Sequence, residues 1–179
     1  EVVTDPDWND GFAIDAVPSV IGSGVISSAL ITQVCNRVAE DFRPWNISVT
    51  TSQSRYDAAG AGQRMRCIIT PTNVAAPGAG GVGYVDSYSG AGVGFSSTIP
   101  AWAFTSSYYN ANDIAGTISH EVGHTLGLSH DGRFDTSDPR FEEYYEGHGS
   151  GATSWGPIMG TTYDRSVSQW SKGEYANAN

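Results

Sequence analysis

The sequence predicts an α+β fold in one domain that has two lobes or layers. Segments 24–42 and 113–126 carry apolar residues at four-residue spacing, which is typical of helices. Segments 46–52 and 64–70 are shorter and have the pattern of strands. A chain of 179 residues, 39% of them hydrophobic, is long enough to bury a substantial core.

The first helix is predicted from an apolar stripe and a terminator. The stripe contains Ile26, Leu30, Val34, Val38 and Phe42. These residues recur every four positions and therefore lie on one face of a helix. Pro44 follows and ends the helix, because proline lacks the backbone N–H that a helix interior needs.

Two strands are expected after this helix. In segment 46–52, Ile47, Val49 and Thr51 stand on alternate positions, as in a half-buried strand. Segment 64–70 forms the second strand. We expect the N-terminal helix to pack against this second strand.

The two cysteines are Cys35, on the predicted helix, and Cys67, on the second predicted strand. Neither has another cysteine nearby, which excludes a CxxC metal or redox motif. Either one disulfide or two buried thiols remain, and packing of the helix on the strand favours the disulfide. Such a bridge would stabilise the fold by roughly 3–4 kcal/mol and would indicate an oxidising compartment.

Segment 77–97 is rich in glycine, with short apolar stretches between the glycines. We expect two short strands joined by a turn. A phosphate-binding loop is the less favoured alternative, because no Lys-Ser/Thr pair follows and no helix begins there. One of the strands is expected to be a sheet edge that can pair with an extended peptide.

Composition limits the partners and the location of the protein. The chain has 19 acidic and 9 basic side chains, a net charge of −10, which argues against binding to nucleic acid or an anionic membrane. The sequence contains no run of about eighteen apolar residues, which is the length that a membrane-spanning helix requires. Glu1 stands in place of an initiator Met and indicates a processed or trimmed product. We expect a secreted monomer.

The second helix carries two histidines opposite its apolar face. Asp113 is the expected N-cap. The apolar residues are Ile114, Ile118, Val122 and Leu126. At about 100° per residue, His120 and His124 lie on the face away from this stripe. A purely structural helix has no reason to place two histidines one turn apart on that face.

Metal binding would explain why two histidines lie one turn apart on this face. Neutral imidazoles one turn apart can reach a single ion, with Zn–N distances of about 2.0–2.1 Å. Glu121 lies on the same flank and can hold a water without being a ligand. A third ligand is needed, and His130 is the candidate. On a straight helix His130 would be about 9 Å further along, so Gly127 is expected to end the helix and let the chain turn back.

The stretch "HEVGHTLGLSH", residues 120–130, resembles the zinc signature of the metzincin metallopeptidases, and the "HD" that ends at Asp131 is most similar to the adamalysin or reprolysin group. Met159, in "WGPIMGTTY", resembles the methionine of the family's Met-turn, with core filler as the alternative. The resemblance implies zinc bound by the residues His120, His124 and His130. It also implies that Glu121 is the general base and Asp131 a structural anchor.

The same resemblance implies a more detailed fold. A mixed twisted sheet, a long N-terminal helix and the zinc-binding helix would form an upper subdomain over about residues 1–127. A smaller, irregular lower subdomain would cover about residues 128–179 and end in a helix over 165–179, with Val167 and Trp170 facing inward. The active-site cleft would lie between the two subdomains of this single catalytic domain.

Several residues depart from the family's pattern. Pro157 stands where the reprolysin group usually has a cysteine, and two cysteines cannot form that group's several disulfides. Thr161 stands where related families carry a tyrosine that supports the oxyanion. Tyr163 is a candidate substitute for transition-state support, against the simpler interpretation of a packed or exposed tyrosine.

Other polar residues leave alternatives open. His148 could contact substrate or a second metal, but a loop histidine bonded to backbone is the simpler interpretation. Segment 134–149 carries several carboxylates, where the family builds the pocket for the residue after the cleaved bond. These carboxylates could also bind Ca²⁺, although they show no regular ligand spacing.

The motifs together predict a zinc-dependent endopeptidase. Zinc lowers the pKa of bound water to about 7, and Glu121 would take the proton and pass it to the leaving amine. One alternative is a zinc hydrolase restricted to small amides or glycopeptides. Another is a binding module with a non-catalytic zinc, which is disfavoured because a structural site usually closes its fourth position with a protein ligand.

Overall fold

The computed structural model describes residues 27–73, 75–88, 99–105, 110–134 and 141–179. The chain divides into two compact units, Glu1–Gly127 and Leu128–Asn179. No helix among the described residues is long and apolar enough to cross a membrane.

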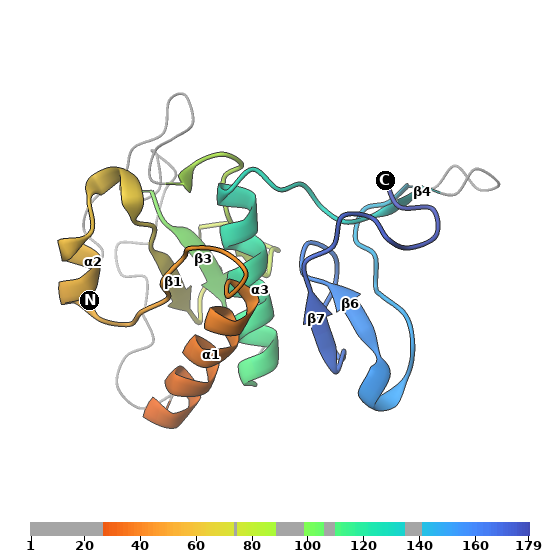
Figure 1. Ribbon diagram of the computed structural model, residues 1–179, viewed down its shortest axis with the longest axis horizontal. Helices are drawn as coiled ribbons and strands as arrows, with labels where there is room; N and C mark the ends of the chain where they lie inside the picture. Colours follow the sequence, from red (N-terminus) through yellow and green to blue (C-terminus); the bar gives the residue numbers. More distant parts are fainter. Residues whose placement is uncertain (1–26, 74, 89–98, 106–109, 135–140) are drawn as a thin grey trace. The chain divides into compact units, whose positions relative to one another are not determined.

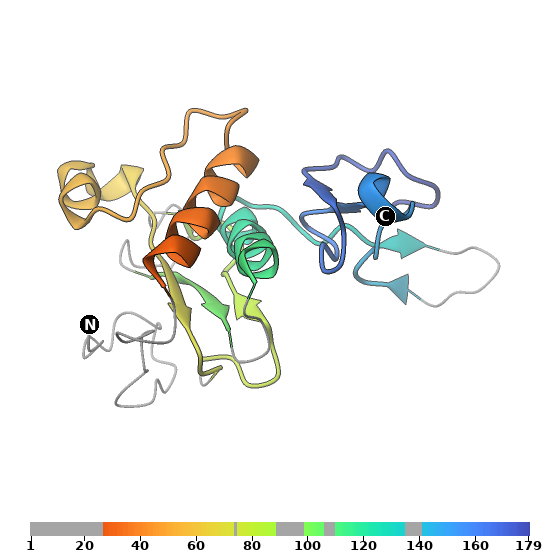
Figure 2. The same ribbon diagram turned by 90° about the horizontal axis from the view of Figure 1, so that it is seen from below.

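The N-terminal unit is built on a mixed sheet with the order β1-β3-β2. Strands β1 (Cys67–Thr70) and β3 (Ala101–Phe104) are parallel, and β2 (Gly81–Val82) pairs antiparallel with β3. Helix α3 (Ala111–Thr125) packs against β3 and also against α1 (Ser28–Asp41), as Figures 1 and 2 show. Mixed strand directions and flanking helices agree with the predicted α+β class.

The apolar stripe of α1 is largely confirmed. Leu30 is half-buried, Val34, Val38 and Phe42 are buried, and Ile26 lies outside the described residues. The helix begins after Ser27, whose hydroxyl accepts a hydrogen bond from the Leu30 N–H at 3.2 Å. It ends at Asp41, so it stops before Pro44 is reached.

The strand predicted over 46–52 is wrong. This segment is irregular and leads into α2 (Gln53–Ala58). Thr50 accepts a hydrogen bond from the Ser52 N–H, and Ser52 accepts one from the Arg55 N–H as the N-cap of α2. These local side-chain bonds satisfy backbone donors that a strand would have paired with a neighbour. The second predicted strand is present but shorter, as β1.

The predicted disulfide is also wrong, because Cys35 and Cys67 are free thiols. The reason is that the helix does not pack mainly on the strand of Cys67, contrary to the expectation from the sequence. Helix α1 rests mainly on α3, whereas Cys67 lies in β1, which pairs with β3. Burial raises the pKa of the Cys67 thiol well above its ordinary value.

Helix α3 begins earlier than predicted. Asn110, rather than Asp113, is the N-cap, and its side-chain oxygen accepts a hydrogen bond from the Asp113 N–H at 2.9 Å. Asp113 lies in the first turn, where its negative charge is favourable near the helix N-terminus.

The apolar stripe of α3 is not its only buried face. Ile114 and Ile118 are buried as expected, but Glu121 and His124 are buried on the other side. The reason is that α3 is covered by α1 as well as by the sheet. Leu126, the last residue of the predicted stripe, is 40% exposed and lies just beyond the helix.

The end of α3 is held by Gly127, which has φ +91°. Its N–H donates to the carbonyl of His124 at 2.9 Å, and the N–H of Asp86 donates to the same carbonyl at 3.1 Å. A Cβ at Gly127 would lie 2.5 Å from Oδ1 of Asp86. Backbone conformation and space therefore both require glycine here.

The C-terminal unit consists of two small sheets and an aromatic core. Its strands are β4 (Arg133–Phe134) antiparallel to β5 (Phe141–Glu142), and β6 (Trp155–Pro157) parallel to β7 (Val167–Gln169). Short 3-10 helices cover Ala61–Gln63 in the first unit and Gly151–Thr153 in this one. Tyr145 and Tyr175 stack with ring centroids 4.2 Å apart, and Arg133 lies over the Tyr145 ring.

The helix predicted over 165–179 is wrong, because residues 167–169 form β7. The N–H of Val167 donates to the carbonyl of Ser154, and the Ser166 N–H donates to the Ser154 hydroxyl. These bonds to a distant segment replace the bonds that a helix would make internally. Val167 is 37% exposed rather than inward, and Trp170 is half-buried.

Core packing around α3 predicts a large difference between two isoleucines. Ile114→Ala removes a side chain that is 2% exposed and should lower the free energy of unfolding by about 2–5 kcal/mol. Ile31→Ala is the matched control, because Ile31 on α1 is 44% exposed and its loss should cost about 0.5 kcal/mol or less. Urea denaturation measures both, and equal losses would contradict this packing.

The end of α3 gives a second prediction. Gly127→Ala places an L-residue at positive φ against Asp86 and should lower the free energy of unfolding by about 1–3 kcal/mol. Gly62→Ala is the control, because nothing lies within 4 Å of the added methyl group. Thermal and urea denaturation should show little change for Gly62→Ala. A Gly127→Ala protein as stable as the unmodified one would refute the account of this helix end.

Candidate metal centre

His120 and His124 lie one turn apart on α3 and face each other. Their Nε2 atoms are 3.1 Å apart, and their rings meet edge to face with centroids separated by 4.7 Å. His124 is buried and His120 is half-buried. The helix backbone alone is sufficient to bring these two nitrogens together.

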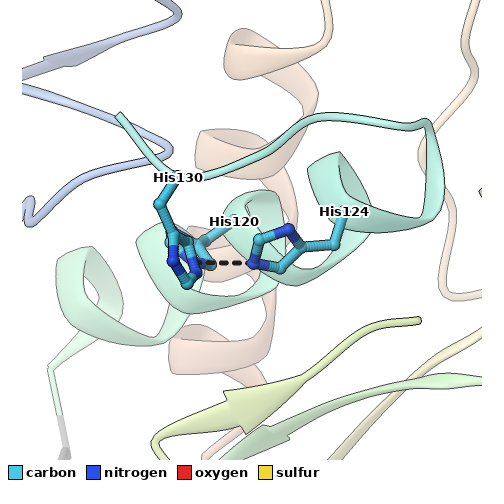
Figure 3. Close-up of side chains that lie close together, drawn as sticks. All are labelled: His120, His124 and His130. Carbon is cyan, nitrogen blue, oxygen red and sulfur yellow. Dashed lines mark hydrogen bonds between the residues drawn. The ribbon is translucent and has the colours of Figure 1, made fainter. Parts of the chain in front are cut away.

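His130 joins the two helical histidines. One ring nitrogen from each of the three residues lies within 4.8 Å of the others. Figure 3 shows the three imidazoles gathered together, His120 and His124 from α3 and His130 from the stretch that follows the helix. In the described part of the chain, this is the group of metal-ligating side chains that could hold an ion.

The three histidines fit a zinc ion. Tetrahedral zinc with Zn–N distances of about 2.0–2.1 Å places its nitrogens roughly 3.3 Å apart, close to the 3.1 Å between His120 and His124. Three imidazoles, with no thiolate or fourth protein ligand grouped with them among the described residues, are the donor set of a catalytic rather than a structural zinc.

His130 has a further partner that sequence reasoning did not identify. Its Nδ1 lies 2.9 Å from Oε1 of Glu143, and the Tyr144 ring packs beside it with centroids 4.2 Å apart. Glu143 belongs to the acidic segment in which only a substrate pocket or calcium was expected. Its distance from His130 along the chain follows no local periodicity, so no sequence signal marked it.

Glu121 is buried beside strand β2, with an exposed fraction of 8%. Burial raises the pKa of its carboxyl to about 8, and a hydrogen bond from the backbone N–H of Gly83 acts in the opposite direction. A bound divalent cation would likewise favour the charged form.

The glycines of segment 77–97 leave room for Glu121. A Cβ at Gly81 would lie 2.7 Å from Oε1 of Glu121, and a Cβ at Gly83 would lie 2.1 Å from its backbone carbonyl oxygen. A larger residue at position 81 would therefore displace the carboxylate, and one at position 83 would push against the backbone of α3. Glycine composition predicted short strands here, but it did not predict this close approach to α3.

Asp131 and Met159 are joined through the backbone. The Asp131 N–H donates to the Met159 carbonyl at 2.9 Å, and the Tyr145 N–H donates to the Asp131 carbonyl at 2.7 Å. Met159 is 3% exposed and lies in a turn closed by a bond from the Gly160 N–H to the Pro157 carbonyl. Burial raises the pKa of the Asp131 carboxyl to about 6.

Tyr163 and His148 are not part of the three-histidine group. Tyr163 is half-buried in the turn after Met159, and support of a transition state by this residue stays a prediction. His148 pairs its backbone N–H and carbonyl with Trp155, and its Nδ1 lies 3.0 Å from the Tyr145 hydroxyl. These bonds agree with the simpler interpretation of His148 as a structural loop residue.

The acidic segment is only partly described, because residues 135–140 lie outside the described ranges. Among its described carboxylates, Glu142 pairs with Arg133 and Glu143 with His130. No acidic cluster suited to calcium is found in the described residues.

A comparison with protein families identifies the chain. A reprolysin-type family model, described as metallo-peptidase family M12, matches residues 26–171. No curated protein and no solved structure gives a significant match. Assignment to the adamalysin group within the family stays a prediction. The matched span includes the three histidines and covers most of the 179 residues, so the chain belongs to metallo-peptidase family M12.

Proposed function

We propose that the protein is a zinc-dependent endopeptidase. His120, His124 and His130 hold the metal, and Glu121 is the general base. The observation that carries the proposal is the convergence of three imidazole nitrogens within 4.8 Å in a chain of family M12. The buried Glu121 directly follows His120 in the sequence.

In the proposed reaction the metal would act as the Lewis acid, and Glu121 would transfer the proton. Zinc held by three histidines supplies Lewis acidity, which lowers the pKa of water to about 7 and polarises a carbonyl. Glu121 accepts the proton of the attacking water at its carboxylate and delivers that proton to the leaving amine. The Gly83 N–H orients the carboxylate for both transfers.

A peptide substrate in extended form suits the edge of the sheet. β2 is one of the two edge strands in the described order β1-β3-β2, and it is the one that lies against Glu121. A peptide that pairs with the side of β2 on which no described strand lies would have its backbone carried past the general base. Side chains of residues 128–179 would then select the residue after the cleaved bond.

The remaining proposals concern location, assembly and ions. The acidic composition supports a secreted monomer that binds neither nucleic acid nor membrane. The free cysteines remove the disulfide as support for secretion. Ca²⁺ binding has no described ligand cluster in its favour, so zinc is the single cofactor that the described geometry supports.

Two alternatives differ in what the site does. A binding module would keep zinc without turnover, and a restricted hydrolase would cleave only special substrates such as glycopeptides. The buried carboxylate of Glu121, which follows His120 in the sequence, favours catalysis, because metal retention alone does not require it.

The role of Glu121 predicts a loss of activity without a loss of metal. Glu121→Gln should reduce cleavage of a fluorescently labelled denatured protein by about 10²- to 10⁴-fold. Zinc content, measured by mass spectrometry, should stay at the level of the unmodified protein. Glu40→Gln on the exposed face of α1 is the control and should leave both quantities unchanged. Equal inactivity of the unmodified and Glu121→Gln proteins at full zinc occupancy would exclude an endopeptidase.

The ligand assignment predicts that two histidines respond differently to substitution. His130→Ala removes one of three ligands and should abolish stoichiometric zinc binding and cleavage together. His148→Ala changes a histidine that contacts Tyr145 and Trp155 rather than the three-histidine group, so zinc should remain bound in equimolar amount. Zinc that persists in His130→Ala would show that the metal is held elsewhere.

A further inference from the structure

We propose that Glu143 is a positioning residue that fixes the tautomer and orientation of His130. This inference rests on the proposed zinc site and adds to it a carboxylate that binds the histidine rather than the metal. Glu143 Oε1 lies 2.9 Å from Nδ1 of His130, within hydrogen-bonding distance.

The hydrogen bond determines which ring nitrogen is available to a metal. A neutral imidazole has one N–H donor and one lone-pair acceptor, and an ionised carboxylate can only accept. Glu143 therefore selects the tautomer of His130 with hydrogen on Nδ1. The lone pair is then on Nε2, the nitrogen that faces away from Glu143.

The hairpin that follows His130 brings Glu143 back to it. Arg133 on β4 pairs with Glu142 on β5, so the next residue, Glu143, is carried toward the start of the hairpin. Gly132 allows the strands to approach there, because a Cβ would lie 2.2 Å from the Glu142 carbonyl oxygen. The ring of Tyr144, the residue after Glu143, also packs against His130.

His130 needs such a partner more than the other two histidines do. His120 and His124 are oriented by the helix that carries them, in which backbone and rotamer are tightly restricted. His130 lies beyond the helix end, in a segment without regular secondary structure. Its ring must therefore be oriented by side-chain contacts, and Glu143 together with Tyr144 provides them.

Loss of such a partner lowers metal affinity. Carboxylates that accept the second N–H of a ligating histidine typically contribute about 10- to 100-fold to metal affinity. Glu143→Ala should therefore raise the dissociation constant for Zn²⁺ by about this factor. Competition with a chromophoric chelator measures the constant on the full chain.

Conservative variants separate the hydrogen bond from the charge. Glu143→Gln keeps the length and an acceptor oxygen but loses the charge, whereas Glu143→Asp keeps the charge and loses the reach. We expect Gln to restore most of the affinity and Asp to restore little. Glu146→Ala is the matched control, because it removes the same charge from an exposed position in the same segment.

A metal-free readout tests the tautomer directly. In nitrogen-15 NMR of the metal-free protein, His130 should carry hydrogen on Nδ1, and Glu143→Ala should shift it toward the Nε2–H form. The Glu143→Gln spectrum should resemble that of the unmodified protein. If Glu143→Ala does not fold, the Gln and Asp variants still decide the question.

The outcomes distinguish this inference from the proposed function. Failure of the unmodified protein to bind zinc would overturn the proposed function. Tight zinc binding by the unmodified protein and unchanged affinity in Glu143→Ala would overturn only the role of Glu143. Affinity retained by Asp and lost by Gln, or an equal loss in Glu146→Ala, would show that charge rather than orientation is responsible and would also overturn it.

Discussion

The requirement that three imidazoles converge on one point governs the centre of this molecule. A helix brings His120 and His124 together without further help, but it would carry the third ligand about 9 Å away. The helix must therefore end soon after His124, and Gly127 at φ +91° ends it. The carbonyls freed at that end need donors, and Asp86 supplies one from the loop after β2. Metal-ligand spacing, helix length and loop contact are thus parts of a single constraint.

The same helix is buried on more sides than its sequence pattern indicates. An amphipathic helix would present its histidines to solvent, whereas α3 is covered by α1 and by the sheet. Glu121 can be buried next to the sheet only because Gly81 and Gly83 have no side chains. A glycine-rich strand therefore serves the site by the close approach of its backbone. Burial raises the pKa of the Glu121 carboxyl, and the Gly83 N–H partly offsets the cost of keeping it charged.

Those parts of the structure that depend on local periodicity could be predicted from the sequence. The buried stripe of α1 and the pairing of His120 with His124 both follow from helix geometry. The irregular stretch 46–52 could not be predicted from alternation, because side-chain bonds at Thr50 and Ser52 outweigh strand propensity. The C-terminal strand β7 depends on pairing with β6, a long-range contact that leaves no periodic signal. Glu143 was missed for the same reason, since only the β4–β5 hairpin brings it to His130.

The three histidines thus acquire their positions by two different physical routes. His120 and His124 are placed by backbone hydrogen bonds inside α3, which are numerous and cooperative. His130 is placed by a hairpin, a carboxylate and an aromatic ring, each of which depends on residues distant in sequence. Its neighbour Asp131 is tied in turn to the Met159 carbonyl, so the turn around Met159 also restrains the third ligand through the backbone. The buried methionine turn and the acidic hairpin thus both restrain His130, the histidine that the helix cannot position.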